Sequence, residues 1–244
     1  MTGPLAKGAL VTYQTAWRPL PVVTVFQYNP ERMTHGWHQP APPGKAGVES
    51  GNPLAVPGLP AESFEFTIYL NADDDVVSGI PVLQQVARQA GVSARLAALE
   101  LMLYPVDGTG TTSRTGQLRG TVSAGLGSSK GTWKLPNATL PVALFYWNAN
   151  RVVPVRVTTL SVTETLYDED LNPRHAEAQL GLRVLTPVEL AAANPTPGTA
   201  TDLAVVAYNQ TLARRRLLAA ANTAGNAIGS AVSLASSITS RLPH

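Results

Sequence analysis

The chain has 244 residues, of which 44% are hydrophobic and 14% are charged, with 18 basic and 16 acidic side chains. This length and apolar content suffice for a sizeable core, whereas the charged fraction lies well below the roughly 25% typical of soluble domains. The near balance of charge argues against nucleic acid as a partner, and the absence of cysteine excludes disulfides, thiolate metal sites and cysteine nucleophiles. We therefore expect much of a neutral surface to be covered by protein partners.

The first seven residues contain Gly3 and Pro4 and lack a basic run followed by an apolar core. No secretory signal is expected there, and the chain is predicted to be synthesised in the cytoplasm. Next, residues 10–13 and 22–28 are rich in β-branched and aromatic side chains and predict an opening pair of strands. Residues 29–60 are rich in proline and glycine, so we expect a long arm that reaches a neighbour.

Residues 63–70 alternate apolar and polar side chains, which predicts a strand with one buried face. The Asx-rich run 71–75 can cap a following helix, predicted over 80–90 and ended by Gly91. Residues 94–103 fit either a second helix or a strand, and the pattern leaves this open. Residues 108–131 are rich in Gly, Ser and Thr and predict an exposed loop.

Two dense apolar runs, 140–147 and 151–157, flank an Asn-Ala-Asn turn and predict a hairpin. The apolar phase changes at Thr158-Thr159, which indicates a bulge, and residues 176–184 alternate as a last strand. We expect residues 187–198 to form a linker and residues 199–244 a helical C-terminal extension. The fold class predicted is thus mainly β with α: a β-barrel or sandwich in residues 1–186, with one packed helix and long loops.

The sequence contains few candidate residues for metal binding or catalysis, and none of them forms a complete motif. The four histidines are scattered, and His35 with His38 lacks the further ligands that a zinc site needs. The run Asp73-Asp74-Asp75 lacks the glycine and the terminal glutamate of a calcium loop, so a capping turn is expected. No nucleophile elbow, phosphate loop, dinucleotide fingerprint or zinc-protease motif occurs, and we therefore expect no enzyme activity, no cofactor and no metal.

Two further functions were weighed from the residues. Paired carboxylates of a cell-wall hydrolase would have to come from Glu62, Glu65, Glu164 and Asp168. The uncharged stretch after Arg216 contains too many Asn, Ser, Thr and Gly residues to favour insertion, so a membrane partner is not expected. A surface- or carbohydrate-binding β-domain, anchored by its C-terminal segment, is the alternative to a structural subunit.

Three segments resemble one family. They are residues 22–32 (VVTVFQYNPER), residues 63–75 (SFEFTIYLNADDD) and residues 140–185, which run from LPVALFYWNANRVVPVRV through LNPR to LRVL. Together they are similar to the tube-type baseplate adaptor proteins of contractile injection systems, a family that often carries a C-terminal LysM domain. The residues that carry this resemblance are Phe26, Asn29, Pro30, Trp147, Pro154, Arg156, Leu171, Asn172, Pro173 and Arg174.

The resemblance implies a tail-tube-like β-barrel and a structural role as a baseplate or hub adaptor that links the inner tube to the spike. It also implies a homo-oligomeric ring, a hexamer by analogy, with the inner tube, the spike and other baseplate proteins as partners. Such a subunit is assembled into a phage-tail-like particle, whether released or retained. Residues 199–244 depart from the family because they lack a LysM-like pattern and are expected to be helical.

Overall fold

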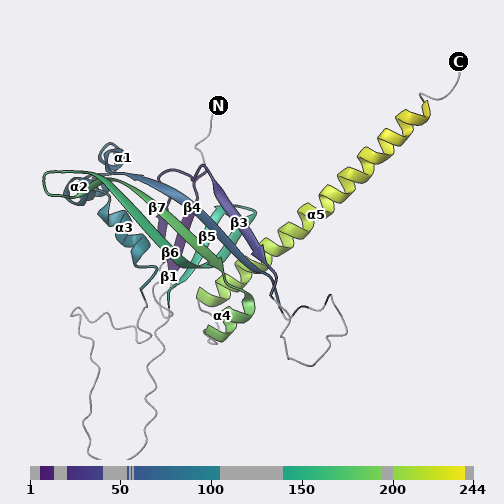
Figure 1. Cartoon of the computed structure of the whole chain (residues 1–244), viewed down its shortest axis with the longest axis horizontal. Helices are drawn as coiled ribbons and strands as arrows, with labels where there is room; N and C mark the ends of the chain where they lie inside the picture. Colours follow the sequence, from purple (N-terminus) through teal and green to yellow (C-terminus); the bar gives the residue numbers. More distant parts are fainter. Residues whose placement is uncertain are drawn as a thin grey trace, which may run out of the picture.

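The computed structural model describes residues 6–13, 21–40, 54, 56, 58–104, 140–193 and 200–239, with side chains described as far as residue 226. In this part of the chain, one antiparallel sheet has the strand order β2-β1-β5-β6-β7-β4-β3 (Figure 1). Its strands are β1 (Ala9–Tyr13), β2 (Pro21–Val25), β3 (Met33–His38), β4 (Ala61–Asn71), β5 (Val142–Asn148), β6 (Arg151–Tyr167) and β7 (Pro173–Val184). The helices are α1 (Ala72–Val76), α2 (Pro81–Ala90), α3 (Ser93–Glu100), α4 (Pro187–Ala193) and α5 (Ala200–Thr239).

The prediction of a mainly β protein with α-helices is confirmed. The sheet is open rather than closed into a barrel, because β2 and β3 stand at its two edges. Helices α1, α2 and α3 gather at one end of the sheet, whereas the first turns of α5 pack against β5 and β6. Beyond those turns α5 leaves the body of the protein, as Figure 1 shows.

The predicted buried faces of β4 and β7 are confirmed. Phe64, Phe66, Ile68 and Leu70 on β4 are each no more than 4% exposed, and so are the apolar side chains at alternate positions of β7. Burying one large apolar side chain contributes roughly 1.5–3 kcal/mol, so this pair of strands supplies much of the core.

Contacts between aromatic rings show how strongly the sheet curls. Phe145 on β5 lies 5.2 Å from Phe64 and 5.5 Å from Phe66, both on β4. In the sheet order, β5 and β4 are three strand steps apart, which is about 14 Å in a flat sheet. The rings can therefore touch only because the sheet folds over on itself and encloses its own core.

The other face of β5 is also covered. Leu144 packs with Leu190 of α4 and with Ala204 and Ala207 of α5, while its neighbours Ala143 and Phe145 point into the main core. Because both faces of β5 are buried, its sequence is apolar without alternation. The predicted hairpin of β5 and β6 is present, and the predicted bulge appears as a register shift between Val157 and Thr159.

Some predicted loops contain regular structure. The arm 29–60 holds β3, which pairs with β4, and the linker 187–198 holds α4. The open choice over 94–103 is resolved in favour of helix α3, so more than one helix packs on the sheet. The loop 108–131, most of residues 41–57 and His244 lie outside the described residues.

The regular structure found in these two segments, β3 and α4, has identifiable physical causes. The segment 33–38 contains no proline, and its His35 ring stacks on Phe64 of the neighbouring strand at 4.1 Å. Helix α4 starts with a capping box: the Thr186 hydroxyl accepts a hydrogen bond from the amide of Glu189, and the Glu189 carboxylate accepts one from the amide of Thr186. Pro187 follows the cap, a position where its missing N–H costs nothing.

Gly91 provides a test of the packing between the helices and β7. Its φ is +55°, and a Cβ added there would lie 2.1 Å from the carbonyl oxygen of Pro173. Gly79 has a φ of +76°, but an added Cβ would meet nothing within 4 Å. We expect Gly79→Ala to cost about 1–2 kcal/mol of unfolding free energy from backbone strain alone, and Gly91→Ala at least about 2 kcal/mol more. Urea unfolding of both variants measures the difference, and equal losses would contradict the close approach.

Candidate assembly surfaces

The edge strand β2 exposes an uncharged, apolar surface. Val22, Val23 and Val25 are all exposed, Val23 by 53%, and the segment Pro21–Val25 contains no charged side chain. β1 pairs with one side of β2, and among the described residues no strand pairs with its other side, although α3 approaches β2. Soluble proteins usually protect such an edge with charged side chains or bulges, because an unprotected edge pairs with other chains. The edge β2 is therefore a candidate site for adding a strand.

The opposite edge of the sheet is β3. It pairs with β4 along one side, and its Trp37 side chain is 56% exposed. The ring of Trp37 lies 3.8 Å from that of His35, which is itself stacked on Phe64. This edge thus presents an aromatic side chain on a strand held firmly against the core.

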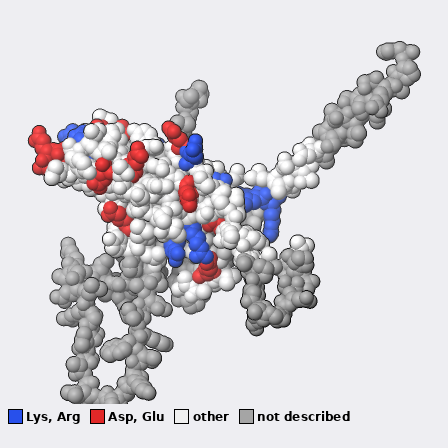
Figure 2. Space-filling view, viewed as in Figure 1, with Lys and Arg blue, Asp and Glu red and all other residues white. Residues whose placement is uncertain are grey.

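Few charges interrupt the visible surface of the body. Figure 2 shows several acidic side chains at the end of the molecule where α1 and α2 lie, and basic side chains both over the middle of the body and where α5 leaves it. Arg214 and Arg216 are exposed at that base of α5. Large apolar side chains are exposed away from the sheet edges as well, among them Val77, Ile80 and Val82 near the start of α2. These exposed apolar side chains are candidates for contact with other proteins.

Three residues of the family-like motifs, Phe26, Asn29 and Trp147, meet around Gly8. Phe26 is 1% exposed, and its amide donates to the carbonyl of Gly8 at 2.9 Å. Asn29 accepts from the Gly8 amide at 2.9 Å and donates to the carbonyl of Ala6 at 2.8 Å. A Cβ on Gly8 would lie 2.8 Å from Phe26 and 3.1 Å from Trp147, and Pro30 nearby in sequence is buried. These residues fix the start of the chain against the core.

A second group of motif residues forms the turn between β6 and β7. Asn172 donates through its amide and its side chain to the carboxylate of Asp168, at 2.8 and 3.0 Å. Those bonds lower the pKa of the Asp168 carboxyl. Leu171 has a φ of +62° and is 78% exposed, while Pro173 is buried and Arg174 pairs with Asp73. The motif is thus used to shape a turn and to attach it to α1.

The remaining motif residues lie on β6. Pro154 is buried opposite Leu144 of β5, and its carbonyl accepts from the amide of Leu185 at 2.9 Å. Arg156 is exposed and stands opposite Arg183 of β7. The motif residues therefore occupy structural positions in separate parts of the sheet, and they do not converge on a single pocket.

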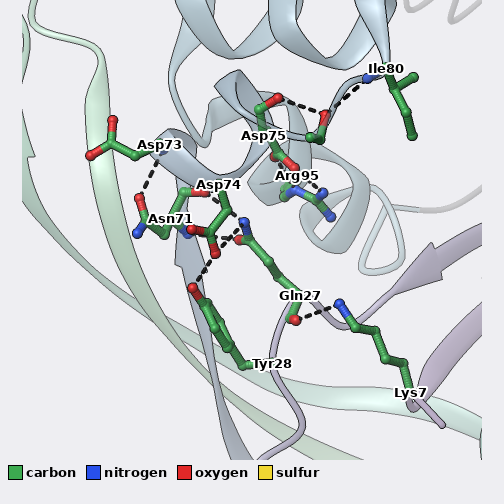
Figure 3. A network of polar contacts seen from close by, with 10 residues as sticks. Lys7, Gln27, Tyr28, Asn71, Asp73, Asp74, Asp75, Ile80 and Arg95 are labelled. Carbon is green, nitrogen blue, oxygen red and sulfur yellow. Dashed lines mark hydrogen bonds and ion pairs between the residues drawn. The ribbon is translucent and has the colours of Figure 1, made fainter. Parts of the chain in front are cut away.

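A polar network attaches the helical end to the sheet (Figure 3). The side-chain amide of Gln27 donates to the carbonyl of Asn71 at 2.7 Å and accepts from the amide of Asn71 at 2.8 Å. The Gln27 side chain thus makes the two hydrogen bonds to the main chain of Asn71 that a neighbouring strand would otherwise make at the end of β4. Asn71 caps α1 by accepting from the amide of Asp73 at 2.9 Å, whereas the predicted helix over 80–90 starts at Ile80 without a side-chain cap.

The acidic run is used for structure. Arg95 of α3 binds both oxygens of Asp75, each at 2.6 Å, and the Tyr28 hydroxyl donates to Asp74. Asp73 pairs with Arg174. No cluster of three or more potential metal ligands occurs within the ranges that the structure describes. The run therefore lies within the short helix α1 and anchors it through ion pairs and hydrogen bonds, rather than forming the capping turn that the sequence predicts.

A buried carboxylate joins α5 to the edge of the sheet. The side chain of Glu62 on β4 is 6% exposed, and it is bound by the guanidinium of Arg215, with one N–O distance of 2.9 Å. His35 of β3 lies 2.7 Å from the same carboxylate. Burial alone would raise the pKa of Glu62, but the hydrogen bonds from Arg215 and His35 outweigh it and lower that pKa. Three elements, β3, β4 and α5, thus meet at one anion.

His35 is the neutral member of this cluster. Burial lowers its pKa, and this effect exceeds the opposing attraction of Glu62. Nε2–H of the neutral ring can then donate to the Glu62 carboxylate.

A second contact attaches α5 to the sheet. One turn before Arg215, the hydroxyl of Thr211 donates to the carbonyl of Val152 at 2.7 Å and accepts from its amide at 3.1 Å.

The carboxylates considered for hydrolysis do not form a pair by these contacts. Glu62 is bound to Arg215 and is buried, whereas Glu65 lies on the opposite, exposed face of β4. Glu164 is exposed, and the nearby Tyr167 hydroxyl donates to it at 3.5 Å. Asp168 is engaged by Asn172.

Comparison with known proteins gave no family: no protein-family model and no curated protein matches the chain. A search of the described helices found none with the length and hydropathy required to span a membrane.

The sequence analysis missed the roles of Glu62, Arg215 and Gln27. For Glu62 a signal exists, because it falls in the same alternating phase as Phe64 and Phe66. Arg215 falls at helical spacing after Ala204, Ala207 and Thr211, which are all buried. Gln27 carries no periodic signal, since its partner Asn71 is distant in the chain.

The Glu62 cluster predicts a large effect of removing one partner. Arg215→Met leaves a buried carboxylate without its cation, so we expect a loss of about 2–3 kcal/mol in unfolding free energy, somewhat less than for a fully buried pair because Arg215 is one-third exposed. The control Arg214→Met, at the exposed neighbouring position, should change the unfolding free energy by no more than about 0.5 kcal/mol. Adding Glu62→Gln to Arg215→Met should recover part of the loss in denaturant titrations; a purely additive double variant would contradict the pairing.

The same cluster predicts acid sensitivity. The pKa of His35 is lower in the folded protein than the value of about 6.5 expected in the unfolded chain. Between these two pKa values the unfolded chain binds more protons than the folded protein does. The free energy of unfolding therefore falls as the pH falls through this window. Glu62, also lowered, adds a further loss below about pH 4.5. His35→Gln should flatten the dependence of unfolding free energy on pH between 7 and 5. The control His38→Gln, on an exposed side chain, should leave the slope as it is, and equal slopes in all three proteins would refute the assignment.

Proposed function

We propose that the chain is a non-catalytic ring subunit of a contractile injection system, an adaptor that joins the inner tube to the spike at the baseplate. The observation that supports this most is an open sheet with two edges that no other described strand pairs with, one of which, β2, is apolar and free of charged side chains. The family-like motif residues lend further support, because most of them shape this sheet or its turns; Arg156, exposed on β6, is the exception. In this proposal the edges are binding sites and the core faces of β4 and β7 hold them in place.

Edge pairing explains how such a chain would form a ring. β2 and β3 are different surfaces, so contact of β2 in one copy with β3 in the next is head-to-tail. A head-to-tail contact closes into a ring when the rotation between copies divides a full turn evenly. Sixfold symmetry is what the family resemblance suggests. Each contact would add main-chain hydrogen bonds and cover the exposed valines of β2 and Trp37 of β3.

The internal contacts suit such a role. A subunit that transmits force between a tube and a spike needs edges that keep their orientation under load. β3 is fixed by His35 and Glu62 to β4 and α5, and the segment after β2 is fixed by Gln27 and Tyr28 to the start of α1. Both edges are thus attached to elements distant in the chain.

A charge on β2 tests the role of the edge. Val23→Glu places a carboxylate on the exposed side of the edge strand and should raise the protein concentration needed for half-assembly about tenfold or more, equivalent to about 1.4 kcal/mol per contact. Val82→Glu makes the same change on α2, where the side chain is 70% exposed, and should leave assembly unchanged. Native mass spectrometry gives the stoichiometry, and circular dichroism checks that both variants fold.

Electron microscopy of the assembled particle decides the wider proposal. A ring of this chain at one end of a tube is the expected result. A wild-type protein that stays monomeric at all concentrations and is absent from particles would defeat it, and so would a Val23→Glu variant that assembles as readily as the wild type.

A further inference from the structure

Helix α5 has two parts with different surroundings. In the first part, buried Ala204, Ala207 and Thr211 face the sheet, and Arg215 ends this docked face with its bonds to Glu62. From Arg216 to Asn226 every side chain is exposed, including Leu217 at 70% and Leu218 at 56%. The helix nevertheless continues to Thr239 and projects from the body (Figure 1).

The projecting part has a composition that does not favour an isolated helix in water. Residues 217–240 contain no charged side chain, so ion pairs between successive turns cannot stabilise it. Gly225, Gly229 and several Asn, Ser and Thr residues have poor helix propensity. In folded proteins, most of the stability of a helix comes from packing against other parts of the structure rather than from its intrinsic propensity. A partner surface is therefore needed to cover this segment.

The sequence of the segment contains a seam of apolar residues with alternating spacings of four and three. Its members are Leu217, Ala221, Ala224, Ile228, Ala231, Ala235 and Ile238. A repeat of 3.5 residues keeps one stripe facing a partner helix along its whole length, which is the pattern of coiled coils. The stripe on one side of the seam, which includes Asn222, Gly225, Gly229 and Ser236, is not apolar throughout. On the other side, Ala220, Ala227 and Leu234 widen the apolar face.

We propose that residues 217–239 of α5 form a parallel coiled coil with the same segment of other copies of this chain. An uncharged, heptad-spaced seam complements another copy of itself, and its alanines allow helices to approach closely. The inference rests on the proposed ring, in which all copies of α5 leave on the same side and run in the same direction. The segment is about 35 Å long at 1.5 Å per residue, enough for three heptads.

The absence of cysteine from the chain allows a direct test by cross-linking. Ala221 and Ala219 are both exposed alanines of α5, but they differ by about 160° around the helix axis, and Ala221 lies on the seam. Under mild oxidation of the full-length protein, Ala221→Cys should form disulfide-linked dimers at least about ten times faster than Ala219→Cys, since a parallel seam brings equivalent positions within disulfide reach. Non-reducing gels over time measure both rates.

Equal rates for the two cysteines, or no cross-link from Ala221→Cys, would overturn the coiled coil. Cross-linking that requires added vesicles of anionic phospholipid would also overturn it, in favour of a membrane surface as the partner. Native mass spectrometry of the same samples separates this result from the proposed function. Rings without the Ala221→Cys cross-link refute the coiled coil alone, whereas a specific cross-link in a protein that forms no rings refutes the ring alone.

Discussion

The packing of Phe145 against Phe64 and Phe66 holds the two halves of one sheet face to face, and the rest of the fold is arranged around that contact. A single sheet can enclose a core only by curling, and these rings fill the space inside the curl. Phe26, which follows β2, completes the cluster at 5.5 Å from Phe66. The sheet still does not close, so β2 and β3 stay unpaired on either side of a well-packed core.

Glu62 couples one of these edges to the projecting helix. His35 on the edge strand β3 and Arg215 on α5 bind the same buried carboxylate, and Arg215 is the last residue of the docked face of α5. The direction in which α5 leaves the body is therefore set by the same contacts that hold β3 in place. In a ring built through the sheet edges, this coupling would give every copy of α5 the same orientation relative to its neighbour.

The sequence predicted those elements whose signal is local. Alternation over Phe64–Leu70, the Gly91 helix end and the bulge after Val157 all depend on neighbouring residues and are present. Asn71 is a cap, but of the unpredicted α1 and not of the helix over 80–90. β3 was missed because prolines and glycines surround it, while its stability comes from His35 stacking on Phe64, a long-range contact. The sequence contains the capping box of Thr186 and Glu189, but the alanine- and proline-rich composition that follows led to the prediction of a linker instead of a helix. An open rather than a closed sheet depends on distant aromatic contacts and on strand count, which no local pattern encodes.

The few charged side chains of the protein are distributed unevenly between ion pairs and the surfaces proposed for assembly. Several of the charged side chains form ion pairs with one another, namely Glu62–Arg215, Asp75–Arg95, Asp73–Arg174 and Arg183–Glu189. The edge β2 and the segment of α5 after Arg216 are left without charged side chains. Association through them must therefore depend on main-chain hydrogen bonds and apolar contact, which salt screens little, in contrast to association steered by charge. Specificity would then come from the fixed angle between the two sheet edges and α5, and that angle is what the buried contacts of Glu62 and Gln27 maintain.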